Sequence, residues 1–223
     1  EYTYGSYSFR SDYSSVQCLS IWEGCLRTGE ELMIYIVRHG QTEKNKANVL
    51  QGRSDVPLNE VGIRQAEDVR DRFRSLGIQF DKVYTSPLIR AVQTAKIIAE
   101  GASPMIEGRL IEMDYGPYEG MDLAQPAPEV MAFFQDFVHI STPEGMEALS
   151  AVVARLGTFL EEIREEAVSQ NILLSTHAIA MKGALEYLTP TSGGSYWSKY
   201  IGNCAVYTAE VGADGHWTIP QEW

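Results

Sequence analysis

The sequence predicts an α/β fold, a three-layer α/β/α sandwich with a mostly parallel central sheet. Three short segments, at 33–37, 80–85 and 172–175, have the composition of strands, and the first, Met-Ile-Tyr-Ile-Val, is typical of a strand buried on both faces. Segments with apolar side chains at helical spacing follow each of them. Because strands that alternate with helices pair in parallel through helical crossovers, helices are expected on both faces of the sheet.

A polar loop at 41–57 separates the first strand from the first helix. Asn59 is the expected N-cap, because its side chain can accept a hydrogen bond from an N–H group of the first turn. Gly77 is expected to end the helix, since glycine adopts the left-handed backbone of a C-cap without strain. The side chains expected on the buried face of this helix are Ala66, Val69, Phe73 and Leu76.

The second strand leads into a helix that Ser86 and Pro87 are expected to begin, with serine as the cap and proline in the first turn. Its expected buried face consists of Ala91, Thr94, Ala95 and Ile98. The later elements expected are an irregular stretch at 104–128, helices near 129–138 and 144–168, the strand at 172–175, a helix at 179–188 and a hairpin of 204–211 with 217–219 around Asp214-Gly215.

Composition limits the classes of partner. The net charge of −12 repels nucleic acids and anionic membranes, so neither is expected to bind, and no apolar run is long enough to span a bilayer. The three cysteines, Cys18, Cys25 and Cys204, lack the spacing of a metal site and fit a reducing compartment. We therefore expect a cytoplasmic protein that needs no metal and no cofactor, with a local cationic pocket if its substrate is an anion.

Residues 1–32 differ from the rest of the chain. They contain four tyrosines and six serines without a sustained helical or strand period. We interpret them as a leader outside the folded domain, which would span 33–223. One hypothesis is that natural translation begins at Met33, because residues 29–31 can be encoded by purine-rich codons that resemble a ribosome-binding sequence.

Basic side chains follow three predicted strands at what should be one edge of the sheet. Arg38 and His39 follow the first strand, Arg90 lies in the first turn after the second, and His177 follows the later one. Each of them alone is as well explained as a solvated surface residue. Together they supply two guanidinium groups and two imidazoles, a set that suits a phosphoryl group held from several sides.

Five separated blocks resemble the histidine phosphatase superfamily, also called the phosphoglycerate mutase-like proteins. The blocks are Val37-Arg38-His39-Gly40-Gln41-Thr42-Glu43 with Asn45, Leu50-Gln51-Gly52-Arg53 with Asp55 and Pro57-Leu58, Ser86-Pro87-Leu88-Ile89-Arg90-Ala91 with Thr94-Ala95, Leu110-Ile111-Glu112-Met113-Asp114-Tyr115-Gly116 with Glu119-Gly120, and Ser175-Thr176-His177. The resemblance covers the chain from Met33 to its end and implies a phosphoglycerate mutase-like fold.

The resemblance also implies roles for the site residues. His39 would be the nucleophile that forms a phosphohistidine, and Glu112 would protonate the leaving oxygen and later take a proton from water. The residues implied to hold the phosphoryl oxygens are Arg38, Arg90 and His177, with further hydrogen bonds from Asn45 and Gln51. The family often has glycine after its second histidine, where this chain has Ala178. We expect activity to survive this difference if Ala178 is helical.

The phosphatases and the mutases of this superfamily share this machinery. Mutases typically carry a basic or histidine-bearing stretch after the acidic residue, whereas residues 113–120 here are rich in carboxylates and the domain is compact. The sequence therefore favours a metal-independent phosphomonoesterase that hydrolyses a small phosphorylated metabolite. The alternatives are a cofactor-dependent phosphoglycerate mutase and, less favoured, a non-catalytic phosphoryl-binding regulator. Glu147 and Lys182 are expected to have local structural roles. The aromatic side chains expected to pack against the core are Phe133, Phe134 and Phe137.

Overall fold

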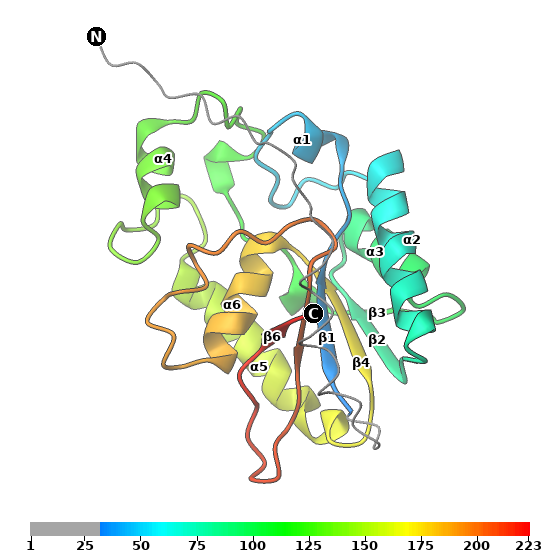
Figure 1. Ribbon diagram of the computed structural model, residues 1–223. Coiled ribbons are helices and arrows are strands. Elements are labelled where there is room, and N and C mark those ends of the chain that lie inside the picture. Colours follow the sequence, from blue (N-terminus) through cyan, green and yellow to red (C-terminus); the bar gives the residue numbers. More distant parts are fainter. Residues whose placement is uncertain (1–31) are drawn as a thin grey trace, which may run out of the picture. The chain divides into compact units, whose positions relative to one another are not determined.

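Six strands form one sheet, in the order β3-β2-β4-β1-β5-β6, in the computed structural model, which describes residues 32–223. The strands are β1 (Ile34–Arg38), β2 (Lys82–Thr85), β3 (Met105–Ile106), β4 (Ile172–Thr176), β5 (Val206–Ala209) and β6 (Gln221–Glu222). The first four run parallel, and β5 and β6 are antiparallel to their neighbours. The mostly parallel sheet is confirmed (Figure 1). Residues 1–31 of the leader predicted at 1–32, which include Cys18 and Cys25, lie outside the described residues.

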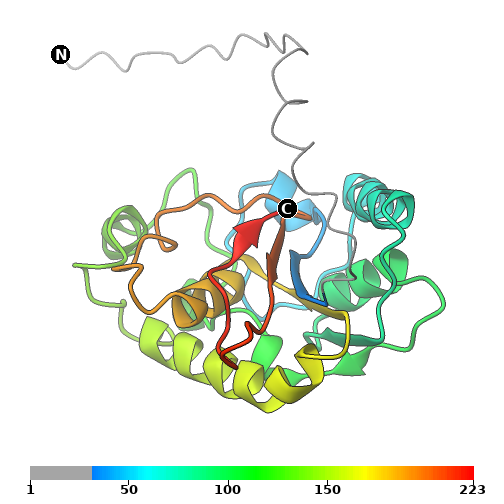
Figure 2. The ribbon, with the colours of Figure 1, turned by 60° about the horizontal axis from the view of Figure 1, so that its bottom comes forward.

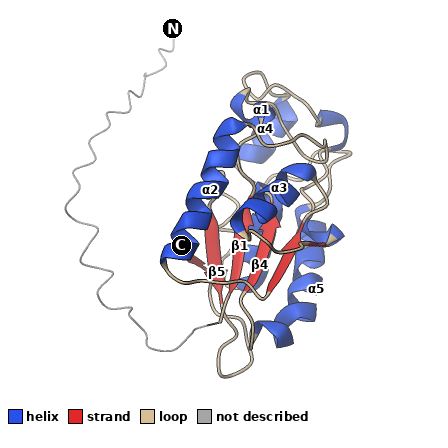
Figure 3. Ribbon diagram, turned by 90° about the vertical axis from the view of Figure 1, so that its right-hand side faces the viewer, coloured by secondary structure: helices blue, strands red, loops and turns tan. Residues whose placement is uncertain are grey.

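Helices cover both faces of the sheet (Figures 2 and 3). They are α1 (Glu43–Lys46), α2 (Glu60–Ser75), α3 (Ile89–Ile98), α4 (Pro128–Gln135), α5 (Leu149–Ala167) and α6 (Ala178–Leu188), with short 3₁₀ helices at Gly108–Leu110 and Gly116–Tyr118. In β1, Tyr35 and Val37 pack with α2 and α3, while Ile34 and Ile36 pack with α5 and α6. The first strand is thus buried on both faces, and the expected three-layer sandwich is confirmed.

Helix α2 begins and ends where the sequence predicts. Asn59 Oδ1 accepts a hydrogen bond from the N–H of Gly62 at 2.9 Å. Gly77 has a positive φ of 72°, and the N–H of Ile78 returns to the carbonyl of Phe73 at 3.0 Å. The expected burial of Leu76 is wrong, because this residue is the C-cap, where the backbone leaves the helix, and it is 49% exposed.

Helix α3 has the expected buried face but a different beginning. It starts at Ile89 rather than at Pro87, and Ser86 is not its N-cap. The cap comes from another segment, because Asp55 Oδ1 accepts a hydrogen bond from the N–H of Ile89 at 2.6 Å. The loop predicted at 41–57 also contains one short helix, α1, which Thr42 caps through the N–H of Asn45.

The second half of the chain departs from the prediction at element ends. Helix α5 begins at Leu149 rather than near 144, since Gly145 has a φ of 88° that no helix contains. In the C-terminal hairpin Trp217 forms only an isolated bridge with Val211, and the strand that pairs with β5 is β6. Among residues 32–223, no helix is both long enough and apolar enough to cross a membrane.

Candidate active site

The carboxyl ends of β1 and β4 meet at one edge of the sheet and fix the backbone of the candidate site. These two strands are direct parallel neighbours, with Arg38 opposite Thr176. The N–H of His39 donates to the carbonyl of Thr176 at 2.9 Å, so the pairing continues one residue beyond β1. His177 follows β4 directly and is the N-cap of α6. Strand pairing therefore places the two histidines side by side, with ring centroids 5.1 Å apart.

His39 is held in one orientation as a neutral ring. It is 3% exposed, and its Nδ1 lies 2.7 Å from the carbonyl oxygen of Gly40. Because a carbonyl can only accept, Nδ1 carries the hydrogen and the lone pair is on Nε2. Burial, together with the charges of Arg90 and Arg38, holds the pKa of His39 well below 6.5. The ring thus presents an unprotonated nitrogen to the site at neutral pH.

Arg90 links the two histidines and is itself fixed by backbone carbonyls. Its Nε–H lies 3.2 Å from His39 Nε2 and 3.2 Å from His177 Nδ1. Its Nη2 donates to the carbonyl of Gly52 at 2.6 Å, and Nη1 donates to that of Ser54 at 2.7 Å. Burial lowers the pKa of Arg90 to about 10, so the group remains a cation at neutral pH.

The partners of His177 set its tautomer too. Since Arg90 Nε can only donate, His177 Nδ1 accepts and Nε2 donates to Ser86 Oγ at 2.7 Å. Burial and the charge of Arg90 hold the pKa of His177 well below 6.5. Sequence reasoning assigned Ser86 only to a helix cap, because the 91-residue separation from His177 gives no local signal.

Arg38 brings a second cation to the same edge. Its Nη1 donates to the carbonyl of Ile201 at 2.6 Å. Its Nε is buried and has no hydrogen-bond partner within residues 32–223. Burial lowers the pKa of this guanidinium, and the carboxylate of Glu112 opposes the shift. A buried donor without a partner is costly, which is expected where a ligand completes the site.

Glu112 reaches the site from the irregular stretch after β3. Glu112 is 3% exposed, and its carboxylate lies at the N-terminus of α6. Oε1 accepts hydrogen bonds from the N–H groups of Met113 at 2.8 Å and Ala180 at 2.9 Å, and Oε2 accepts one from Ile179 at 3.2 Å. These N–H groups suit a carboxylate, because the first turn of a helix leaves its donors unpaired. Ala178 is the first residue of α6, one residue before the predicted start of this helix, so it is helical.

Asn45 and Gln51 lie close to the site, and their side chains form hydrogen bonds with neighbouring protein groups. Asn45 Oδ1 accepts from the N–H of Thr42 at 3.2 Å and from Asn203 Nδ2 at 3.3 Å. The Gln51 amide lies between Thr42 Oγ1, at 2.6 Å, and Arg90 Nη1, at 2.8 Å, and both contacts are satisfied when its oxygen faces the guanidinium. Their contact with a phosphoryl group stays a prediction.

Two further charged residues support this region. Glu119 accepts hydrogen bonds from the N–H groups of Gly52 at 2.9 Å and Arg53 at 3.1 Å, and so holds the loop whose carbonyls anchor Arg90. Lys182 is buried, donates to the carbonyl of Trp197 at 2.6 Å, and has its pKa lowered by burial to about 8. No periodicity in the sequence indicates either contact.

The described part of the chain groups no three His, Cys, Asp or Glu side chains in a way that could hold a metal ion. Cys204 is buried and free, and burial raises the pKa of its thiol to about 12, so it is an unreactive thiol rather than a nucleophile. The chemistry that this edge of the sheet can perform on its own therefore combines a neutral imidazole, two guanidinium groups and one carboxylate.

Comparisons with known proteins show which family the chain resembles. The family described as the histidine phosphatase superfamily (branch 1) matches residues 34–221. Probable phosphoglycerate mutase GpmB of Yersinia pestis is 33% identical over 181 residues, which cover 78% of this chain and 83% of that protein.

Solved structures show the same fold. Bacillus stearothermophilus YhfR superimposes with a TM-score of 0.75 at 27% identity, over 84% of this chain and 94% of that one. The Entamoeba histolytica phosphoserine phosphatase in complex with 3-phosphoglyceric acid superimposes with a TM-score of 0.74 at 22% identity, over 85% of this chain and 95% of that one. The expected phosphoglycerate mutase-like fold is confirmed.

Proposed function

The chain belongs to branch 1 of the histidine phosphatase superfamily, a family of enzymes that act on phosphorylated small molecules, and we propose that it is a metal-independent phosphomonoesterase. The observation that carries the proposal is the state of His39. Its ring is neutral, its Nδ1–H is held by the carbonyl of Gly40, and its Nε2 lone pair lies beside the Arg90 guanidinium. A nucleophile oriented in this way, next to a fixed cation, suits attack on a phosphate monoester.

In the first step, His39 Nε2 bonds to phosphorus while the bond from phosphorus to the ester oxygen breaks. Glu112, which enters this step in its protonated form and is held at the N-terminus of α6, transfers its proton to the departing oxygen, so the leaving group is released as a neutral alcohol and Glu112 is left as a carboxylate. In the second step, Glu112 takes a proton from a water molecule that attacks the phosphohistidine. Inorganic phosphate leaves, and both side chains return to their starting states.

The phosphoryl oxygens would be stabilised by the cations at the sheet edge. Arg90 is held rigidly by the carbonyls of Gly52 and Ser54, so its charge is preorganised before substrate arrives. Arg38 contributes its unpartnered Nε–H, and His177 contacts the same Nε–H of Arg90 that faces His39. In phosphoryl transfer, catalysis comes mainly from such positioning and from stabilisation of the charge on these oxygens.

The second candidate function is that of a mutase, which the name of the Yersinia relative favours. Against it stands the chemistry beside Glu112. Asp114 pairs with Arg53 at 3.0 Å, and Glu119 binds the loop at Gly52, so the first two charged residues that follow Glu112 in the sequence are anions. Two fixed carboxylates disfavour a substrate that carries a carboxylate of its own, as phosphoglycerates do.

The activity test follows two products in parallel. The protein is incubated with a panel of phosphorylated metabolites, and also with 3-phosphoglycerate after priming with 2,3-bisphosphoglycerate. We expect inorganic phosphate and the free alcohol to appear in equal amounts, and both to vanish in His39→Asn. Interconversion of phosphoglycerates without phosphate release would establish the mutase instead. Binding of the panel without either product would establish a non-catalytic regulator.

A further inference from the structure

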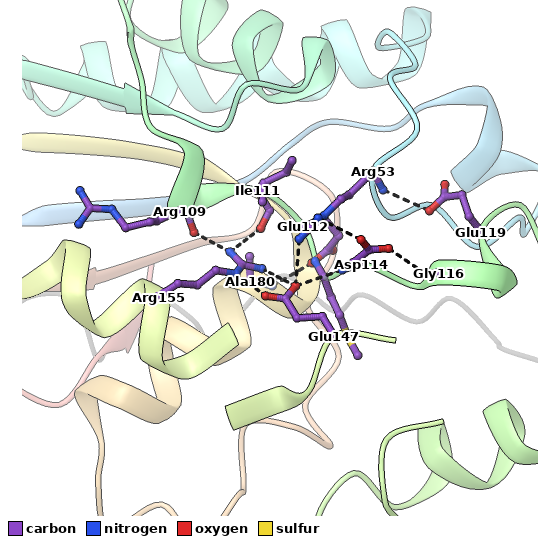
Figure 4. A network of polar contacts seen from close by, with 11 residues as sticks. Arg53, Arg109, Ile111, Glu112, Asp114, Gly116, Glu119, Glu147, Arg155 and Ala180 are labelled. Atoms are coloured by element: carbon purple, nitrogen blue, oxygen red, sulfur yellow. Dashed lines mark hydrogen bonds and ion pairs between the residues drawn. The ribbon is translucent and has the colours of Figure 1, made fainter. Parts of the chain in front are cut away.

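An ion pair between Arg155 and Glu147 lies beside the loop that carries Glu112 (Figure 4). We propose that this pair positions Glu112 for proton transfer to the leaving group. The inference rests on the proposed phosphatase function and adds two positioning residues to it. Arg155 lies in α5, and Glu147 lies in the turn just before α5, so neither belongs to the strand ends that hold the phosphoryl group.

The Arg155–Glu147 pair forms two hydrogen bonds and is mostly buried. Arg155 Nε lies 2.8 Å from Glu147 Oε1, and Arg155 Nη2 lies 3.2 Å from Oε2, which makes the contact bidentate. The two side chains are only 16% and 13% exposed. A bidentate, mostly buried pair fixes orientation as well as charge, and only arginine offers this planar arrangement of donors.

The remaining donors and acceptors of the pair bind the backbone on both sides of Glu112. Arg155 Nη1 donates to the carbonyl of Ile111 at 2.7 Å, on the N-terminal side. Glu147 Oε2 accepts from the N–H of Asp114 at 3.1 Å, and the Glu147 N–H donates to the Asp114 carbonyl at 2.8 Å, on the C-terminal side. Glu112 lies in the short segment between these anchors. One ion pair therefore fixes the backbone that carries the Glu112 side chain.

Two glycines allow this close approach. Gly116 and Gly145 have positive φ values of 50° and 88°, and a Cβ atom at Gly116 would lie 2.1 Å from the carbonyl oxygen of Gly145. The turn after Glu112 and the turn before α5 therefore pack backbone against backbone, which a larger residue would prevent. Gly145 lies two residues before Glu147, so this backbone contact brings the Glu147 carboxylate to the loop.

Arg53 joins this assembly to the phosphoryl-binding half of the site. Its Nη1 lies 3.0 Å from Asp114 Oδ2, and its Nη2 lies 3.5 Å from Glu147 Oε2. Arg53 follows Gly52, whose carbonyl anchors Arg90. The side chain is 44% exposed, so these contacts are weaker than the Arg155 pair. They nevertheless connect the loop of the proton donor to the loop of the phosphoryl clamp.

A positioning role predicts a kinetic signature that general stabilisation does not produce. Protonation of the leaving oxygen matters for an alkyl phosphate, because an alkoxide is a poor leaving group. It matters little for 2,4-dinitrophenyl phosphate, whose phenolate leaves without a proton. The parameter kcat/KM reports the steps up to departure of this group, so the ratio of kcat/KM for the two esters isolates proton transfer.

The test compares Arg155→Lys and Glu147→Gln with the wild type on an alkyl phosphate and on 2,4-dinitrophenyl phosphate. Because a misplacement of about 1 Å can cost about 10²-fold, we expect kcat/KM for the alkyl ester to fall by about 10- to 100-fold. For the activated ester we expect less than about a threefold change, since the phosphoryl clamp is intact. The ratio is independent of the fraction of folded protein, so partial unfolding of a variant cannot imitate this result.

Two variants complete the comparison. Glu112→Gln should show the same selective loss, because it removes the proton itself. Arg164→Gln removes another arginine of α5, one that pairs with Glu161 at 2.7 Å on the exposed face, and should alter neither ester. The selective loss in Arg155→Lys and Glu147→Gln, without one in Arg164→Gln, supports the inference.

Three outcomes would overturn the inference, and they differ in what else they remove. Equal losses for both esters in Arg155→Lys and Glu147→Gln, beside a selective loss in Glu112→Gln, would refute the positioning role alone. Equal losses in Glu112→Gln would remove the proton donor and with it the positioning role. Failure of the wild type to release phosphate from either ester would refute the proposed function itself.

Discussion

The two halves of the site differ in what holds their side chains. In the phosphoryl-binding half, His39 and His177 follow the ends of two paired strands, and Arg90 is fixed by backbone carbonyls. In the proton-donor half, Glu112 lies on an irregular segment whose backbone is anchored by the Arg155–Glu147 ion pair. Strand pairing is cooperative and rigid, whereas a side-chain pair can be removed by one substitution. A substitution in one half should therefore impair the step that this half performs and leave the step of the other half intact.

The largest effect is expected from Arg90→Lys. Lysine cannot donate at once to the two carbonyls and to both imidazoles that Arg90 contacts, so the phosphoryl oxygens lose a preorganised cation. We expect kcat/KM to fall by about 10³-fold. The loss should be equal for alkyl and activated esters, because every substrate carries the phosphoryl group. A loss confined to the alkyl ester would contradict the separation of the two halves.

The next effect concerns stability against acid, which should originate in the phosphoryl-binding half. The pKa values of His39 and His177 lie well below 6.5 in the folded protein, so below pH 6.5 the unfolded chain binds more protons than the folded one. The free energy of unfolding should fall with decreasing pH, by about 1.4 kcal/mol per pH unit for each imidazole between its unfolded and folded pKa values.

Urea unfolding of the wild type and His177→Asn at pH 7.5, 6.5 and 5.5 measures this slope. The variant lacks one of the two imidazoles. Its free energy of unfolding should therefore fall less steeply with decreasing pH than that of the wild type, by the amount that His177 contributes. Because other titrating groups are common to both proteins, they cancel in the difference. Identical slopes would mean that His177 is not held neutral by burial.

A smaller effect is expected from Ser86→Ala. The serine hydroxyl accepts the Nε2–H of His177, and its loss leaves the buried imidazole without the partner that fixes its tautomer. The loss of one hydrogen bond to a buried group costs about 1–3 kcal/mol, so we expect kcat/KM to fall about tenfold for both esters. Ser86→Thr retains the hydroxyl and should recover most of the activity. A Ser86→Ala enzyme with unchanged kcat/KM would exclude a role for this contact.

The smallest effect is expected from metal removal. Residues 32–223 offer no cluster of metal ligands, and the proposed mechanism uses only protein side chains. Incubation with a chelator, followed by gel filtration, should leave kcat/KM within the error of the assay. A loss of activity that a divalent cation restores would place a metal in one of the two halves.

The difference between the halves also explains what the sequence could predict. Arg38 ends β1, His39 and His177 directly follow strands, and a local pattern is enough to bring the three to one edge. The cap of α3 by Asp55 and the contact of Ser86 with His177 join segments 34 and 91 residues apart, which no periodicity records. The sequence predicts a buried Leu76 because this residue continues the apolar spacing of α2. The helix ends one residue earlier, so the spacing no longer determines which way Leu76 faces.

The proton-donor half was harder to predict for the same reason. The resemblance to the histidine phosphatase superfamily marks Glu112. Its backbone, however, is anchored by Arg155, 44 residues beyond Ile111, and its carboxylate accepts hydrogen bonds from the first turn of α6. Ion pairs between loops and distant helices follow from tertiary packing. A sequence motif can therefore mark such a residue without showing which groups it contacts.

The central claim is that His39 carries the phosphoryl group during turnover. The most direct measurement is rapid acid-free quenching of the protein with a ³²P-labelled aryl phosphate, followed by peptide mapping of the label. We predict a base-stable, acid-labile phosphoryl group on His39 that forms and decays as fast as product is released, and that is absent in His39→Asn. Turnover without any such label, or a label that persists in His39→Asn, would contradict the account.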